Sequence, residues 1–211
     1  MCIAIYIPAN KQISRKTIYT CWKANSDGAG FMYSKDNNLV VEKNLFSPRA
    51  FYQKYKRAAD RNPDSNFVMH FRWATHGEIN INNCHPILLS NKSIGFVHNG
   101  ILRDLPDDPV KSDSVIFRDT ILEKLPRRFM SNKLLIVLLE KYIGNYNKII
   151  LMNKTGSVVI LNEEAGLWHD GCWYSNTGFS TERVNNPHFK PKIRNVTEEM
   201  LLHDHRLIGY V

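Results

Sequence analysis

The chain has 211 residues, 43% of them hydrophobic and 23% charged, a balance typical of globular proteins and unlike that of disordered chains. Its longest apolar run, at 134–139, is far shorter than the ~18 residues that cross a bilayer, which excludes a membrane span. The apolar stretch at 3–7 follows no basic segment and stops at Pro8, so it predicts a strand and not a signal peptide. We therefore expect one cytoplasmic domain over 1–211, with 183–211 as a C-terminal extension of undetermined structure.

The chain is basic, with 28 Lys and Arg against 20 Asp and Glu and a formal net charge of +8. This charge permits a nucleic-acid or acidic partner, but the basic residues at 54–61 have the spacing of a solvated helix face. The four cysteines are widely separated and form no CxxC pair: Cys2, Cys21, Cys84 and Cys172. They are expected to be free thiols and not a disulfide framework.

The elements are predicted from runs of β-branched and aromatic residues, from apolar periodicity and from capping residues. In chain order they are strands at 2–7, 29–34 and 39–43, a helix at 48–61, strands at 66–72 and 93–97, helices at 113–125 and 132–143, and strands at 148–152, 157–161 and 166–174. Polar turns at 35–38 and 153–156 predict two hairpins. The helix at 132–143 is apolar almost all round and is expected to be buried. This order indicates an α+β fold of layers with antiparallel sheets.

Cys2 directly follows the initiator methionine and becomes the first residue of the chain if Met1 is removed. Its α-amine, with a reference pKa of ~7.7–8.0, is then partly neutral and can accept the proton of the thiol. One residue would supply both a nucleophile and its base. A small buried cysteine in an edge strand has the same sequence, so Cys2 alone does not separate catalysis from packing.

A second group of residues follows a predicted strand, in the string HFRWATHG at 70–77. Arg72, at the strand end, can bind a carboxylate through two parallel hydrogen bonds. Trp73 and Thr75 can form a loop that closes over a small substrate, and Gly77 permits the turn that such a loop requires.

Two shorter motifs complete the candidate site, HNG at 98–100 and SDS at 112–114. The side chain of Asn99 and the N–H of Gly100 can form an oxyanion hole, although Asn-Gly is also a common turn. Asp113 can bind a substrate ammonium, or it can simply favour the N-terminus of a helix. With the thiol and the arginine, these groups suit an amino acid whose side-chain amide is hydrolysed through a thioester.

In this order the motifs resemble those of the class II glutamine amidotransferases, a branch of the N-terminal-nucleophile hydrolases. The resemblance covers about 2–180 and rests on the following strings: Cys2, NSDGAG at 25–30, HFRWATHG at 70–77, NCHP at 83–86, HNG at 98–100, SDS at 112–114 and WYSN at 173–176. It implies a four-layer αββα sandwich, in which two antiparallel sheets lie between helix layers. It also implies glutamine as substrate, glutamate and ammonia as products, and neither metal nor cofactor.

At the matching positions, the resemblance implies that Cys2 is the nucleophile and that Asn99 and the Gly100 N–H form the oxyanion hole. Arg72 would bind the carboxylate of glutamine, and Asp113 its amine. The implied glutamine loop has four residues: Trp73, Thr75, His76 and Gly77. The ~30 residues after the part of the chain that carries the resemblance, about 2–180, are too few for a synthase module. The chain is therefore expected to be a stand-alone glutaminase-type domain, with the ammonia acceptor on a separate synthase or acceptor-binding protein.

Two other functions remain open. A hydrolase of other γ-glutamyl amides would use the same residues, whereas a catalytically silent basic module for nucleic acid or a protein partner would need none of them. The histidines at 70, 76, 85 and 98 with Cys84 fit no closed zinc site. A Ser-His-Asp triad has no GxSxG turn to support it.

Overall fold

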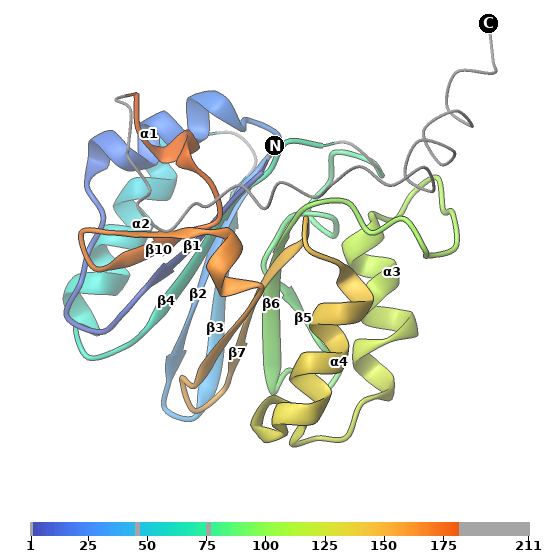
Figure 1. Ribbon diagram of the computed structural model, residues 1–211. Coiled ribbons are helices and arrows are strands. Elements are labelled where there is room, and N and C mark those ends of the chain that lie inside the picture. The colour runs from blue at the N-terminus through green and yellow to red at the C-terminus, as the bar shows by residue number, and fades with distance from the viewer. Residues whose placement is uncertain (1, 45–46, 75–76, 182–211) are drawn as a thin grey trace, which may run out of the picture.

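Two β-sheets occupy the middle of the molecule (Figure 1). The computed structural model describes residues 2–44, 47–74 and 77–181. The six-stranded sheet, in the order β3-β2-β4-β1-β10-β9, contains β1 (Ile3–Ile7), β2 (Ala29–Lys35), β3 (Asn38–Asn44), β4 (Phe67–Phe71), β9 (Leu167–His169) and β10 (Cys172–Tyr174). The four-stranded sheet, in the order β5-β6-β7-β8, contains β5 (Ile87–Leu88), β6 (Ile94–Asn99), β7 (Lys148–Asn153) and β8 (Val158–Leu161). The described strands pair antiparallel throughout, and β2-β3 and β7-β8 are the two predicted hairpins.

Helices cover the outer face of each sheet. On the six-stranded sheet these are α1 (Arg15–Ala24) and α2 (Pro48–Arg61), and on the four-stranded sheet α3 (Asp113–Thr120) and α4 (Lys133–Ile143), as Figure 1 shows. Three clusters of buried apolar side chains separate the layers, one beneath each helix pair and one between the sheets. This confirms the α+β fold and the four-layer αββα arrangement expected from the motifs.

The strands are apolar on both faces because each sheet is covered on both sides. Successive side chains of a strand point to opposite faces, so Ile3 and Ile5 pack toward the helices while Ala4 packs toward the other sheet. There Ala4 joins a cluster to which Val97 and Ile150 of the second sheet belong. This burial between the sheets fixes the ends of β1, β4 and β6 relative to one another, and those ends carry the motifs.

α1 is absent from the predicted elements. It begins at an N-cap, Ser14, whose hydroxyl accepts a hydrogen bond from the N–H of Thr17 at 3.0 Å. Its buried face consists of Ile18, Cys21 and Trp22, Tyr19 is partly buried beside them, and most of the other residues are polar. So narrow an apolar stripe gives weak periodicity in the sequence, and the helix is recognisable mainly from its packing on the sheet.

Three further elements differ from the prediction. The strand predicted at 166–174 is the hairpin β9-β10, because Asp170 and Gly171, with φ of 50° and 77°, form a two-residue turn with positive φ at both positions. The helix predicted at 113–125 ends early as α3, and a 3₁₀ turn at Leu122–Lys124 follows it. β5 is absent from the predicted strands, because its two residues are too few to show an alternating pattern.

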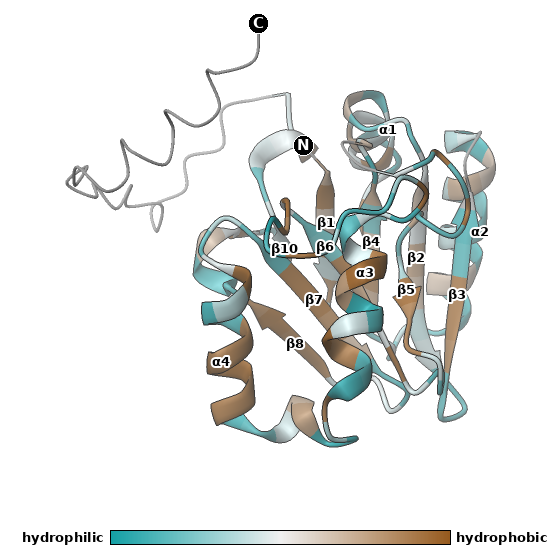
Figure 2. Ribbon diagram, turned by 90° about the vertical axis from the view of Figure 1, so that its right-hand side faces the viewer, coloured by the Kyte–Doolittle hydropathy of each residue, from teal (hydrophilic) through white to brown (hydrophobic). Residues whose placement is uncertain are grey.

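α4 is less buried than its composition predicts. Leu139 and Ile143 face the four-stranded sheet, but Leu134, Val137 and Leu138 are 66%, 45% and 50% exposed. A helix that lies on one sheet buries only the side that faces it, so apolar residues on the opposite side remain at the surface. Figure 2 shows this hydrophobic colouring on α4 at the edge of the molecule. None of the described helices has both the length and the apolar character needed to cross a bilayer.

Candidate active site

The candidate nucleophile lies against the residue that follows Arg72. Cys2 precedes β1 and Trp73 follows β4, and these strands pair with Ile3 opposite Phe71. Because antiparallel pairing puts the start of one strand beside the end of its neighbour, the thiol meets the Trp73 backbone. The Trp73 N–H donates to Cys2 Sγ at 3.3 Å, and the thiol donates to the Trp73 carbonyl at 3.4 Å.

A pocket of about 540 Å³ opens in front of this thiol. It brings together four of the predicted site residues: Cys2, Trp73, Asn99 and Gly100. The rest of its wall comes from the segment 101–105 and from the end of α4 and the loop after it, including Tyr142 and Tyr146. The volume is within the range of about 300–1,000 Å³ that is usual for small-molecule sites.

The backbone and side chain of HNG are held tightly at the end of β6. Asn99 is buried, and its Nδ2 donates to Ser175 Oγ at 2.7 Å, which also accepts the N–H of Ala4 at 2.9 Å. Gly100 has φ 149°, and a Cβ there would lie 2.1 Å from Asn147 Oδ1. Only glycine fits this close approach, so the Gly100 N–H has a defined position beside the amide of Asn99.

Burial raises the pKa of the Cys2 thiol above its ordinary value. The hydrogen bond with the Trp73 backbone acts in the opposite direction, but the net direction is upward. The thiol is therefore protonated at neutral pH, and nucleophilic attack by it requires a base close to the sulfur.

Arg72 and Asp113 do not line the 540 Å³ pocket. Arg72 is buried, and its Nη1 donates to the carbonyl of Glu78 at 3.0 Å. The carboxylate of Asp113 accepts the N–H groups of Leu102 at 2.9 Å and Ser114 at 2.7 Å, and it lines an adjacent pocket of about 340 Å³. The structure thus brings the thiol and the oxyanion-hole candidates together, and holds the two predicted charged groups near them in contacts within the protein.

Two members of the predicted glutamine loop, Thr75 and His76, lie outside the described residues. Trp73 is 49% exposed at the mouth of the pocket. Gly77, at the other end of the loop, packs so closely on the SDS motif that a Cβ would lie 2.7 Å from the N of Ser112. The described ends of the loop are therefore attached to the nucleophile on one side and to the start of α3 on the other.

Asp27 and Asn83 support the loop and have no predicted role. The carboxylate of Asp27, in the NSDGAG string, accepts the N–H of Ala74 at 2.8 Å. Asn83, in the NCHP string, donates to the carbonyl of Glu78 at 3.0 Å and accepts the N–H of Ser112 at 2.8 Å. Both residues lie in motifs that carried the resemblance, but only the fold shows what they bind.

His98 connects the oxyanion-hole candidates to α3. Its Nδ1 is 2.9 Å from Ser114 Oγ, and its Nε2 is 2.9 Å from Asn147 Oδ1. Burial lowers the pKa of His98, so the ring is neutral at neutral pH, although Asp113 opposes this shift. His98 is thus a positioning residue that orients Asn147 against Gly100.

His70 and His85 lie in the contact between the two sheets. His70 and His85 lie with ring centroids 4.2 Å apart, and the Nε2 of His70 is 2.9 Å from the carbonyl of His98 in the other sheet. Burial lowers the pKa of His70 to about 3, and that of His85 well below its ordinary value. Within the described ranges, no group of three or more His, Cys, Asp or Glu side chains is placed to hold a metal ion.

The fold occurs in solved structures of other proteins. It is similar to the solved structure of the glutamine phosphoribosylpyrophosphate amidotransferase from B. subtilis, complexed with ADP and GMP, with a TM-score of 0.52 at 13% identity. A second solved structure, of the allosteric regulatory enzyme of purine biosynthesis, has a TM-score of 0.56 at 15% identity. Each similarity covers 82% of this chain and 41% of the other. The chain therefore shares its fold with part of each of these two enzymes.

Part of the sequence is similar to glutamine-dependent aminotransferases. Part of the chain is 34% identical over 80 residues to the glutamine–fructose-6-phosphate aminotransferase (isomerizing) of Clostridium perfringens, covering 37% of this chain and 12% of that protein. The enzyme of the same name from Staphylococcus aureus is 34% identical over 83 residues, covering 37% and 13%. No protein-family model matches the chain. The predicted resemblance to glutamine amidotransferases is confirmed, and the matches span about an eighth of these relatives' length.

Proposed function

We propose that this protein hydrolyses the side-chain amide of glutamine to glutamate and ammonia, with Cys2 as an N-terminal nucleophile once Met1 is removed. The observation that supports this most directly is the position of the Cys2 thiol, in one pocket with Asn99 and Gly100. The acceptor of the ammonia is on a separate protein, and the reaction takes place in the cytoplasm.

The reaction begins when the α-amine of Cys2 accepts the thiol proton and the sulfur attacks the amide carbon of glutamine. The oxygen of the tetrahedral intermediate receives hydrogen bonds from Asn99 Nδ2 and the Gly100 N–H. Ser175 engages one of the two N–H groups of Nδ2 and thereby orients the other. The same amine returns the proton to the leaving nitrogen, ammonia departs and a thioester remains. Water then attacks the thioester, which releases glutamate and regenerates the thiol.

Recognition of the α-carboxylate and α-ammonium of glutamine requires Arg72 and Asp113 to turn toward the substrate. Both lie beside the pocket, where Arg72 donates to the carbonyl of Glu78 and Asp113 accepts from the N–H groups of Leu102 and Ser114 and from the Ser114 hydroxyl. Binding of glutamine would exchange these contacts for charged ones, while the loop of Trp73, Thr75, His76 and Gly77 closes over it. Substrate binding and loop closure are therefore one event in this proposal.

Replacing Arg72 by Gln is expected to raise the KM for glutamine by about 10- to 100-fold with little change in kcat. A hydrogen bond to a charged group contributes about 1.5–3 kcal/mol, and this one is made equally in the ground state and the transition state. Steady-state kinetics measures the effect. Arg57→Gln, at an exposed cation of α2 outside the thiol pocket, is the matched control and should leave KM unchanged. An unaltered KM in Arg72→Gln would remove this role.

Labelling with a glutamine-like diazoketone tests the proposal as a whole. Intact-mass and peptide mass spectrometry are expected to show a chain that starts at Cys2 and carries one adduct on Cys2, because its thiol alone faces the pocket. Excess glutamine should protect it. The purified chain should also release one ammonia per glutamate, since the acceptor is elsewhere. Labelling of Cys84 or Cys172 instead, or modification of a chain that retains Met1, would contradict the proposal.

A further inference from the structure

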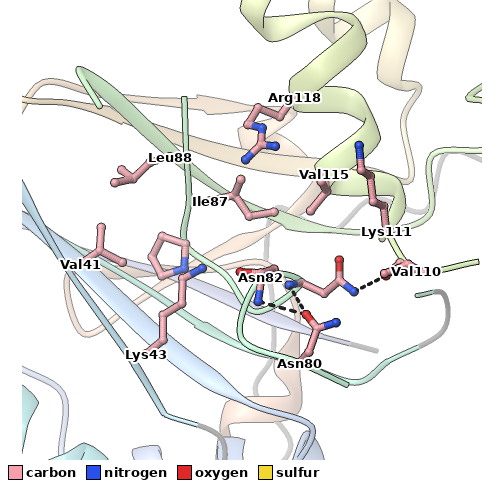
Figure 3. A pocket seen from close by; sticks show the side chains of 12 residues that line it. Val41, Lys43, Asn80, Asn82, Ile87, Leu88, Val110, Lys111, Val115 and Arg118 are labelled. Carbon is pink, nitrogen blue, oxygen red and sulfur yellow. Dashed lines mark hydrogen bonds between the residues drawn. The ribbon is translucent and has the colours of Figure 1, made fainter. Parts of the chain in front are cut away.

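A second pocket, of about 480 Å³, lies on the side of the sandwich between β3 and α3 (Figure 3). It shares no lining residue with the thiol pocket. Its apolar wall includes Val41, Ile87 and Val115, from β3, β5 and α3. The remaining wall is formed by asparagines of the 80–83 segment and by cations. A wall of this kind suits a ligand with an apolar part and a charged part.

Three cations line this pocket. Figure 3 shows Lys43 on one side of the space and Arg118 on the other, with Lys111 on the α3 side. Asp119 pairs with Arg118 at 2.6 Å and with Lys111 at 3.1 Å, so one carboxylate serves two cations. Asp108, which accepts the backbone N–H of Lys111 at 2.9 Å, is a second carboxylate beside these cations. Three positive charges against two negative charges leave a net positive charge.

Lys43 accounts for the net positive charge of the pocket. Its Nζ donates to the carbonyl of Ile81 at 3.1 Å, and among the described residues no carboxylate lies within ion-pair distance of it. Burial lowers its pKa, and the nearby charge of Arg118 lowers it further. A half-buried ammonium without a counter-charge is destabilising, and a bound anion would offset that cost.

We propose that this pocket binds a small organic phosphate. The net positive charge favours an anion, and the several oxygens of a phosphate can accept hydrogen bonds from Lys43 and Arg118 on opposite sides of the space. The apolar wall of Val41, Ile87 and Val115 would hold the organic part of the ligand.

The pocket also includes Asn83, which supports the segment next to the glutamine loop. Asn83 hydrogen-bonds the carbonyl of Glu78 and the N–H of Ser112, so an occupant would stabilise both ends of this support. Bound phosphate is therefore expected to lower the KM for glutamine. This coupling rests on the proposed glutamine hydrolysis, whereas the binding itself does not.

Isothermal titration calorimetry of the full chain with phenyl phosphate, at constant ionic strength, tests the binding. Lys43→Met and Arg118→Met are each expected to weaken it at least about tenfold, because each removes a charged hydrogen bond. Lys35→Met, an exposed cation on the neighbouring strand β2, is the matched control and should bind as the parent does. The Cys2→Ala variant should bind with full affinity, which separates this site from catalysis.

The proposal would be supported if phenyl phosphate binds saturably to the parent and more weakly to both pocket variants. The thermal unfolding of these variants should stay close to that of the parent. Undetectable binding by the parent, or equal affinity in parent, Lys43→Met and Arg118→Met, would overturn it. Binding that benzoate matches would replace the phosphate by a carboxylate. Glutamine kinetics with and without phenyl phosphate then decide the coupling. An unchanged KM would remove it and leave the binding site standing.

Discussion

Cys2→Ala is expected to reduce kcat for glutamine hydrolysis by at least ~10⁴-fold, to the level of the uncatalysed background. The thiol is the atom that forms the thioester, and the alanine methyl cannot replace it. The fold should survive, because the thiol is half-buried at a strand end. Alanine loses the hydrogen bonds with the Trp73 backbone but keeps the one from Asn176 to the carbonyl of residue 2. Coupled glutamate release and thermal unfolding are the two measurements.

Two controls separate the thiol and the amine of Cys2. Cys21→Ala, at a buried cysteine of α1 away from the pocket, should lower stability by about 1 kcal/mol and leave kcat unchanged. A chain with an uncleaved N-terminal extension keeps the thiol but converts the α-amine to an amide, so it should also be inactive. Hydrolysis at the parental rate by Cys2→Ala would end the assignment. The same rate in the extended chain would show that another group is the base.

Asn99→Ala is expected to lower kcat by about 10²- to 10³-fold with KM nearly unchanged. It removes one of the two donors to the oxyanion, which develops only in the transition state. Steady-state kinetics with glutamine measures the split between kcat and KM. The fold should be retained, since the Nδ2 of Asn99 has a single acceptor among the described residues, Ser175 Oγ.

Ser175→Ala is the matched control for Asn99. It removes the hydroxyl that orients Nδ2 and leaves both N–H groups of the amide in place, so the expected loss in kcat is about tenfold, the effect of one hydrogen bond. A larger loss in Ser175→Ala than in Asn99→Ala would indicate that the hydroxyl acts on the substrate. A small loss in both would place the oxyanion elsewhere.

Much of this protein can be read from local sequence. Continuous apolar runs bounded by turn residues predict most strands and the two hairpins, and Ser47 and Ser112 mark the starts of α2 and α3 through the hydrogen bonds they accept. The site residues are short motifs whose chemistry follows from residue type and order. These features depend on neighbours in the chain, which is why they are visible without the fold.

Other features depend on contacts between distant segments, and the tertiary structure alone decided them. Trp73 lies beside Cys2 through the β1-β4 register, and Asn83 joins the loop end to Ser112 across two separate segments. The outer side of α4 is exposed because a single sheet covers the helix. Lys43 and Arg118 line one pocket because β3 and α3 lie on either side of it. Residue order records which groups are present, whereas packing between layers determines which of them meet.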